Sequence, residues 1–139
     1  MIKETTEMLE QLKVAESLND YLEDNDEQLI DSTMSTQLEA ALAETGLTKA
    51  DVLRRAEIND IYGYQLFTGN RKPSRDKLIA LCVGMELTTE RTQQLLKATG
   101  FAPLYAKNKR DSIIFFGIQH KQSVFEINNA LYEHNEKTL

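Results

Sequence analysis

The sequence contains few of the residues that form turns or cross-links: it has one cysteine, two prolines and six glycines in 139 residues, and it has no tryptophan. One cysteine excludes an internal disulfide framework and a multi-cysteine metal site, and it suits a reducing compartment. So few glycines and prolines disfavour a turn-rich β-sandwich or barrel. The longest apolar stretch, Leu78–Met85, is far shorter than the roughly 20 residues of a membrane-spanning helix. We therefore expect an all-α protein without membrane association.

The motifs of common enzyme classes are also missing. The two histidines, His120 and His134, have no neighbouring acids at ligand spacing, which makes a zinc site improbable. No Gly-rich dinucleotide motif, no phosphate-binding loop and no Gly-flanked serine nucleophile occurs. The start of the chain, MIKETTEMLE, carries acids where a signal peptide would be basic. These observations predict a cytoplasmic protein that is not an enzyme and uses no cofactor or metal.

What the sequence does contain is charge, and it is unevenly distributed. The net charge is −6, yet residues 1–46 carry twelve acidic and two basic side chains, a balance of −10. Residues 47–110 carry twelve basic and six acidic side chains, a balance of +6, and residues 111–139 have a balance of −2. A basic middle section favours a polyanionic partner, although a solvated helical surface would have the same composition.

The first part of the chain reads as an acidic helical arm, residues 1–33. From Ile2 to Leu22 the apolar side chains recur every three or four residues, which predicts one helix with an apolar stripe. The acidic run 23–27 then predicts a loop, because clustered acids oppose the dipole at a helix C-terminus. The residues of this stripe are Leu9, Leu12, Ala15, Leu18 and Leu22.

Beyond residue 34, caps and stops mark a series of short helices. Thr36 with Glu39, Thr48 with Asp51 and Ser123 with Glu126 have capping-box spacing; Ser74 and Thr88 also read as N-caps. Gly46, Gly69 and Gly100 stand where helices should end. The run IIFFGI, residues 113–118, is predicted to be helical because no second strand exists for it to pair with. The predicted helices are 36–45, 49–56, 60–67, 75–84, 89–98 and two more near 110–119 and 124–133.

One segment has the pattern of a known family. Residues 46–88, GLTKADVLRRAEINDIYGYQLFTGNRKPSRDKLIALCVGMELT, combine two short helices around a tight turn with a following Gly-Asn-Arg-Lys-Pro-Ser loop. This pattern resembles the Cro/repressor-type helix-turn-helix family, over about residues 35–92. The resemblance implies a compact bundle containing a lambda-repressor-like helix-turn-helix. In that interpretation residues 34–139 form one domain, with its core at 35–92 and a helical extension at 93–139.

The spacing of the apolar residues predicts a core, and the resemblance implies a set of DNA contacts. In the family the third helix, here 60–67, enters the major groove of duplex DNA. The residues at core spacing for a compact four- or five-helix unit are Val52, Leu53, Ala56, Ile58, Leu66, Leu78, Leu81, Cys82, Met85 and Leu87. The implied DNA-binding residues are Lys49, Asn59, Asp60, Ile61, Tyr64, Gln65, Arg71, Lys72 and Arg75.

Each implied contact has a chemical basis. Lys49 would bind a phosphate near a helix N-terminus, and Asn59 and Gln65 carry the amides that read adenine. Tyr64 would contact a thymine methyl or a phosphate, and the remaining cations would follow the backbone. For Arg71 and Lys72 ordinary loop solubility is the alternative, and Tyr62 is assigned to core packing.

Three residues depart from the family pattern. Gly63 stands at a position that is normally apolar, where it weakens the helix but permits a close approach. Glu57 replaces the usual glycine of the turn, so that turn must be strained or built differently. Asp60 places a carboxylate where DNA is expected, which is repulsive unless it accepts from cytosine or pairs with Arg54 or Arg55.

The sequence thus predicts a sequence-specific duplex-DNA binder, a bacterial transcription regulator. The alternative is a protein-interaction module that keeps the fold without binding DNA. A homodimer is expected, through either the leucine stripe of residues 9–22 or the C-terminal helices with Phe115, Phe116, Ile118, Phe125 and Leu131. The acidic arm would then compete with DNA for the basic middle section.

Overall fold

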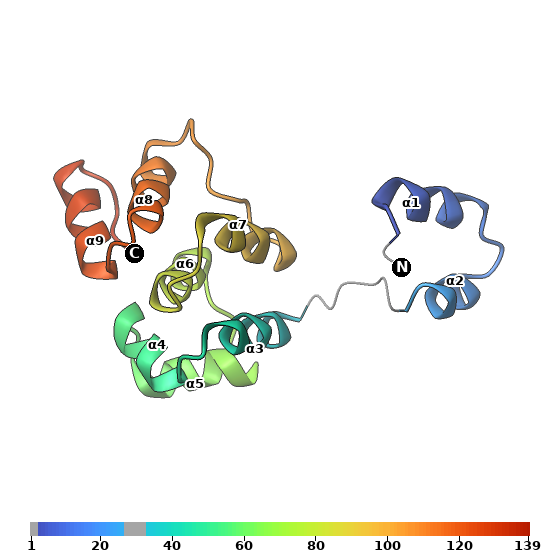
Figure 1. The fold of residues 1–139 in the computed structure, drawn as a ribbon, viewed down its shortest axis with the longest axis horizontal. Helices are drawn as coiled ribbons and strands as arrows, with labels where there is room; N and C mark the ends of the chain where they lie inside the picture. The colour runs from blue at the N-terminus through green and yellow to red at the C-terminus, as the bar shows by residue number, and fades with distance from the viewer. Residues whose placement is uncertain (1–2, 27–32) are drawn as a thin grey trace. The chain divides into compact units, whose positions relative to one another are not determined.

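The structure is a computed structural model that describes residues 3–26 and 33–139. The described residues form nine α-helices and no strand, which confirms the all-α prediction (Figure 1). They fall into two compact units, one on each side of residues 27–32. In Figure 1 the first unit is blue and the second runs from cyan to red.

The first unit contains two helices, α1 (Thr5–Val14) and α2 (Leu18–Asp24), where the apolar spacing had predicted one. The single-helix prediction was wrong because Ala15 has extended backbone and the Ser17 hydroxyl accepts a hydrogen bond from the N–H of Asp20, which starts a new helix. The predicted loop at 23–27 was wrong at its start, since α2 continues to Asp24; Ile2 and Glu27 lie outside the described residues.

The leucine stripe of the first unit is not buried within that unit. Neither α1 nor α2 has a buried residue, and Leu9, Leu12, Leu18 and Leu22 are all exposed or largely exposed. The unit is closed instead by polar contacts: the Lys3 ammonium donates to the Asn25 side-chain oxygen at 2.6 Å.

The second unit contains seven helices whose bounds match the predicted ones closely. They are α3 (Met34–Thr45), α4 (Lys49–Ala56), α5 (Asp60–Thr68), α6 (Arg75–Gly84), α7 (Thr89–Ala98), α8 (Lys109–Gln119) and α9 (Val124–Glu133). Residues 113–118 are helical, as predicted.

The caps explain why these bounds were predictable. Thr48, Ser74 and Thr88 each accept a backbone hydrogen bond at the start of a helix, and Ser123 forms a full capping box with Glu126. The predicted box at Thr36 was wrong: α3 starts two residues earlier, at Met34, so Thr36 lies inside the helix. Gly46, Gly69 and Gly100 have left-handed backbone where helices end, as predicted.

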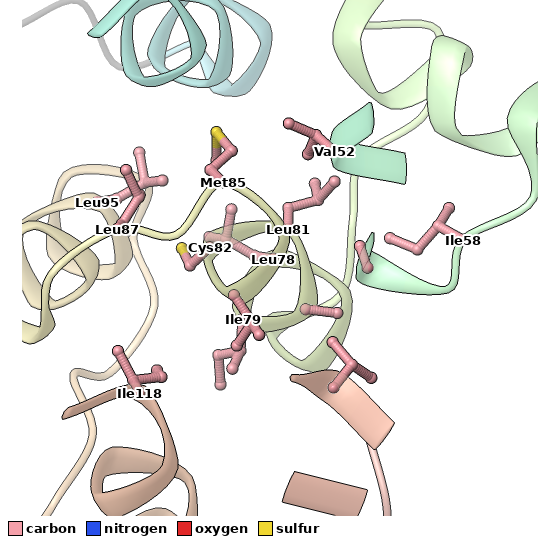
Figure 2. Packing of buried hydrophobic residues seen from close by; sticks show 14 of the residues in the cluster. Val52, Ile58, Leu78, Ile79, Leu81, Cys82, Met85, Leu87, Leu95 and Ile118 are labelled. Carbon is pink, nitrogen blue, oxygen red and sulfur yellow. The ribbon is translucent and has the colours of Figure 1, made fainter. Parts of the chain in front are cut away.

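Helix α6 is the centre of the second unit. All its residues from Leu78 to Gly84 are buried, and it packs against α4, α7 and α9. Figure 2 shows Leu81 and Cys82 of α6, with Val52 above Leu81 and Leu95 to the left of Cys82. Every core residue predicted from the sequence is buried. The Cys82 thiol has no exposed area, and burial raises its pKa to about 12.

Candidate nucleic-acid interface

The candidate interface is built on α4, α5 and the loop that follows α5. Helix α4 ends at Glu57, whose backbone is left-handed (φ 58°). The next N–H, that of Ile58, donates to the Leu53 carbonyl at 3.0 Å, which is the long bond of a Schellman motif. The expected strain at Glu57 is therefore present: the turn keeps the left-handed geometry although no glycine supplies it.

Helices α4 and α5 approach each other through Gly63. A Cβ atom at this position would lie 2.2 Å from Cδ2 of Leu53, which is well inside van der Waals contact. The close approach anticipated for Gly63 is thus confirmed. It seats one face of α5 (Gly63, Leu66 and Phe67) in the core, so the opposite face is turned outward.

The outward face of α5 presents side chains three and four residues apart. Ile61 is 75% exposed and Tyr64 is 44% exposed, while Gln65 is half-buried beside them. Asp60 and Thr68, at the two ends of the helix, are also exposed. This face contains no basic residue.

Asn59 is the N-cap of α5. Its side-chain oxygen accepts hydrogen bonds from the N–H groups of Ile61, at 2.9 Å, and Tyr62, at 3.3 Å. The oxygen is therefore occupied within the protein. An amide that reads adenine needs both its oxygen and its NH₂ group, so only the donor half of Asn59 is available to a partner.

The loop after α5 carries two exposed cations, Arg71 and Lys72. The Arg71 guanidinium lies over the ring of Tyr62, 5.9 Å from its centroid. Tyr62 is half-buried against the core, as expected, but it also holds Arg71 next to α5. Sequence reasoning missed this second role, because nothing in the spacing of the two residues reveals it.

Arg71 differs from the other arginines of the protein. In the described ranges, 3–26 and 33–139, the other five each form an ion pair with a carboxylate, at N–O distances between 2.7 and 3.3 Å. Neither Arg71 nor Lys72 has a carboxylate partner among those residues. The Asp60 carboxylate is not paired with Arg54 or Arg55, which bind Asp51 and Glu86.

Two of the predicted DNA-binding residues, Lys49 and Arg75, form ion pairs within the protein. The Lys49 ammonium lies 2.7 Å from a carboxylate oxygen of Glu39 and 5.4 Å from the centroid of the Phe67 ring. Arg75 forms a bidentate pair with Asp111, at 3.1 and 3.0 Å, and donates further to the carbonyls of Ala102 and Pro103. These two cations thus differ from Arg71 and Lys72, which have no carboxylate partner in the described part of the chain.

Among the residues that the structure describes, no group of three or more histidine, cysteine or acidic side chains is arranged to hold a metal ion. Within the same ranges no helix is long and apolar enough to cross a membrane. Comparison of the chain with protein-family models, with curated proteins and with solved structures gave no match.

Proposed function

We propose that this protein binds duplex DNA in a sequence-specific manner through α4 and α5, used as a helix-turn-helix, and acts as a bacterial transcription regulator. The observation that carries the proposal is Arg71, an arginine without a carboxylate partner in the described chain, held by Tyr62 beside the exposed face of α5. A guanidinium without a carboxylate partner beside the exposed face of a helix is suited to a phosphate.

The contacts divide into two kinds. Ile61, Tyr64 and Gln65 would face base edges in the major groove, because they share the outward side of α5. Arg71 and Lys72 would bind phosphates that flank the groove, and Asn59 would donate from its NH₂ group to an acceptor. Lys49 and Arg75 are assigned to support of the fold, since their cationic groups are already engaged.

The rest of the proposal follows from this role. One short helix reads too few base pairs for specific regulation, so we infer a homodimer that places two copies of α5 on one site. The protein would act in the cytoplasm, without catalysis and without a cofactor.

The test is fluorescence anisotropy with a labelled duplex pool over a salt series. The variant Arg71→Ala/Lys72→Ala should bind DNA more weakly, and the log–log salt slope should become shallower by about two, because about two phosphate contacts are lost. The matched control is Lys97→Ala/Lys121→Ala, which removes the same charge from α7 and from the turn before α9. Its slope should stay that of the unmodified protein.

An equal loss in both variants would mean that only net charge attracts DNA. Absence of binding at low salt would overturn the proposal.

A second candidate function is a protein-interaction module. The observation that favours it is the composition of the α5 face, where Ile61 and Tyr64 are apolar, Asp60 is acidic and no base occurs. Such a face suits an apolar protein partner with a basic rim. Ile61→Ala would then abolish capture of the partner while the protein showed no salt-dependent affinity for DNA.

A further inference from the structure

A second exposed apolar surface lies on α8, far along the chain from the candidate interface. Helix α8 contacts both α7 and α9 (Figure 1). Phe116 on this helix is 57% exposed, and its ring lies against that of His120, one turn further on, with centroids 4.0 Å apart and the ring planes tilted by 32°. The two rings form a ridge on α8.

A hollow opens on each side of this ridge. One, of about 470 Å³, lies towards α7 and is lined by Leu104, Tyr105 and Phe115 among others. The other, of about 320 Å³, lies towards α9 and is lined by Ile113 and Ala130 among others. Phe116 forms part of the wall of both hollows, so the same patch of surface contains a protruding ring and the recesses beside it.

Three polar side chains of the larger hollow, those of Gln93, Ser112 and Gln119, already form hydrogen bonds within the protein. Gln93 donates to and accepts from the backbone of Leu104, at 2.9 and 2.7 Å. The Ser112 hydroxyl donates to the carbonyls of Ala106 and Asn108, and the Gln119 oxygen accepts from Thr89. These three side chains therefore offer an occupant little further hydrogen bonding, and the rings of Phe115 and Phe116 in the same hollow favour an apolar side chain as the occupant.

The absence of charged side chains among the described residues around the two hollows favours a second copy of this chain over other apolar occupants. No aspartate, glutamate, lysine or arginine lines either hollow, in a protein in which 27% of residues are charged. Two copies carry the same charges everywhere, so an uncharged patch is where they can meet without opposing like charges. A twofold interface also requires one patch to fit itself, and a ridge beside a recess meets that requirement.

We propose that α8 is the homodimer surface of this protein, with Phe116 of each copy inserted in a hollow beside α8 of the other. Of the two dimer surfaces expected from the sequence, this is the one on the C-terminal helices and not the leucine stripe of residues 9–22. It also changes the set of residues involved, because Ile118 and Leu131, predicted as dimer contacts, are buried in the core. The proposal specifies the dimer of the proposed regulator but is tested without DNA, so either can fail alone.

The test is sedimentation equilibrium of the full chain over a range of micromolar concentrations. Phe116→Glu should raise the dimer dissociation constant about 30-fold or more, the effect of losing a central aromatic anchor. Tyr132→Glu is the matched control, because Tyr132 is an exposed aromatic of α9 that lines neither hollow. It should leave dimerisation unchanged.

A second variant leaves the ridge intact. Ala106→Trp would place a ring of the same chain in the larger hollow and should also weaken the dimer. Circular dichroism would show that both variants keep their helices. The proposal is overturned if the unmodified protein is monomeric at high micromolar concentration, or if neither variant weakens the dimer. It is equally overturned if Leu12→Glu/Leu18→Glu, in the first unit, dissociates the dimer and Phe116→Glu does not.

Discussion

Single residues in this protein hold conformations that their side chains do not favour. Glu57, Glu86 and Lys121 have positive φ at helix ends, where glycine or asparagine usually stands. For residues such as glutamate and lysine the left-handed conformation costs roughly 1–2 kcal/mol. The second unit therefore contains local strain that single substitutions can relieve.

Glu57→Gly should stabilise the protein. The glycine would adopt φ 58° without strain, and the gain is reduced by the greater entropy of glycine in the unfolded chain, so we expect about 0.5–1 kcal/mol. Urea denaturation measures the change. Glu86→Gly is the contrasting variant: its backbone has the same conformation, but it also loses the 2.7 Å ion pair with Arg55, so its gain should be smaller.

Gly63→Ala should lower the stability of the protein. In an ordinary helix interior alanine is favoured over glycine, but here the added Cβ would overlap the Leu53 side chain. We expect destabilisation by about 1–3 kcal/mol, as for other overpacked cores. In the Leu53→Ala background the same substitution should cost much less, which a double-mutant cycle would reveal. Equal costs in both backgrounds would contradict the clash.

At the scale of elements, two crossed ion pairs join the starts of α6 and α8. Arg75 on α6 binds Asp111 on α8, and Arg110 on α8 binds Asp76 on α6. Burial opposes ionisation of Asp111, but hydrogen bonds from Arg75 and from the N–H of Tyr105, with the nearby guanidinium charges, outweigh it and lower the pKa of this carboxyl. The pairs fix the extension 93–139 to the helices before it.

This lowered pKa predicts how stability depends on pH. A carboxylate whose pKa is lower in the folded state stabilises the fold above its unfolded pKa of about 3.9, and this contribution is lost as pH falls through the folded pKa. Asp111→Asn should therefore cost about 2 kcal/mol at neutral pH. The difference from the unmodified protein should shrink below about pH 4, as followed by urea denaturation at several pH values. A difference independent of pH would show that Asp111 acts only through packing.

The elements themselves were largely predictable, because their signals are local. Each of these signals lies within a few residues of the helix end that it marks, as for the hydroxyl caps Thr48 and Ser123 and the left-handed Gly69. The break at Ala15–Ser17 was missed because the leucine spacing continues across it. The ion pair of Arg75 was missed because its partner Asp111 is 36 residues away along the chain. Residue spacing in the sequence does not predict a contact over that separation.

On the scale of the whole molecule, charge is divided between the two units. Residues 1–31 carry ten acidic and two basic side chains, and residues 32–139 carry twelve acidic and fourteen basic ones. The net charge of −6 is thus the sum of −8 and +2. For a polyanionic partner the first unit contributes repulsion and the second contributes attraction.

A shortened chain starting at Met34 should therefore bind DNA more tightly than the full chain at low salt. Removal of the net charge of −8 should raise the affinity about tenfold or more, and the gain should disappear at high salt, where charges are screened over a few ångströms. Anisotropy titrations at two ionic strengths measure both effects. Equal affinities at low salt would contradict the expected competition between the arm and DNA.

Because Cys82 is buried, its reactivity measures how often the core of this protein opens. It is the sole thiol of the chain, and a pKa of about 12 leaves almost none of it as reactive thiolate at neutral pH. A thiol reagent can therefore modify it only in molecules whose core has transiently come apart. The modification rate then follows the population of opened molecules, so the unmodified sequence can rank ligands and solution conditions by their effect on stability, without a dye, a tag or an engineered cysteine.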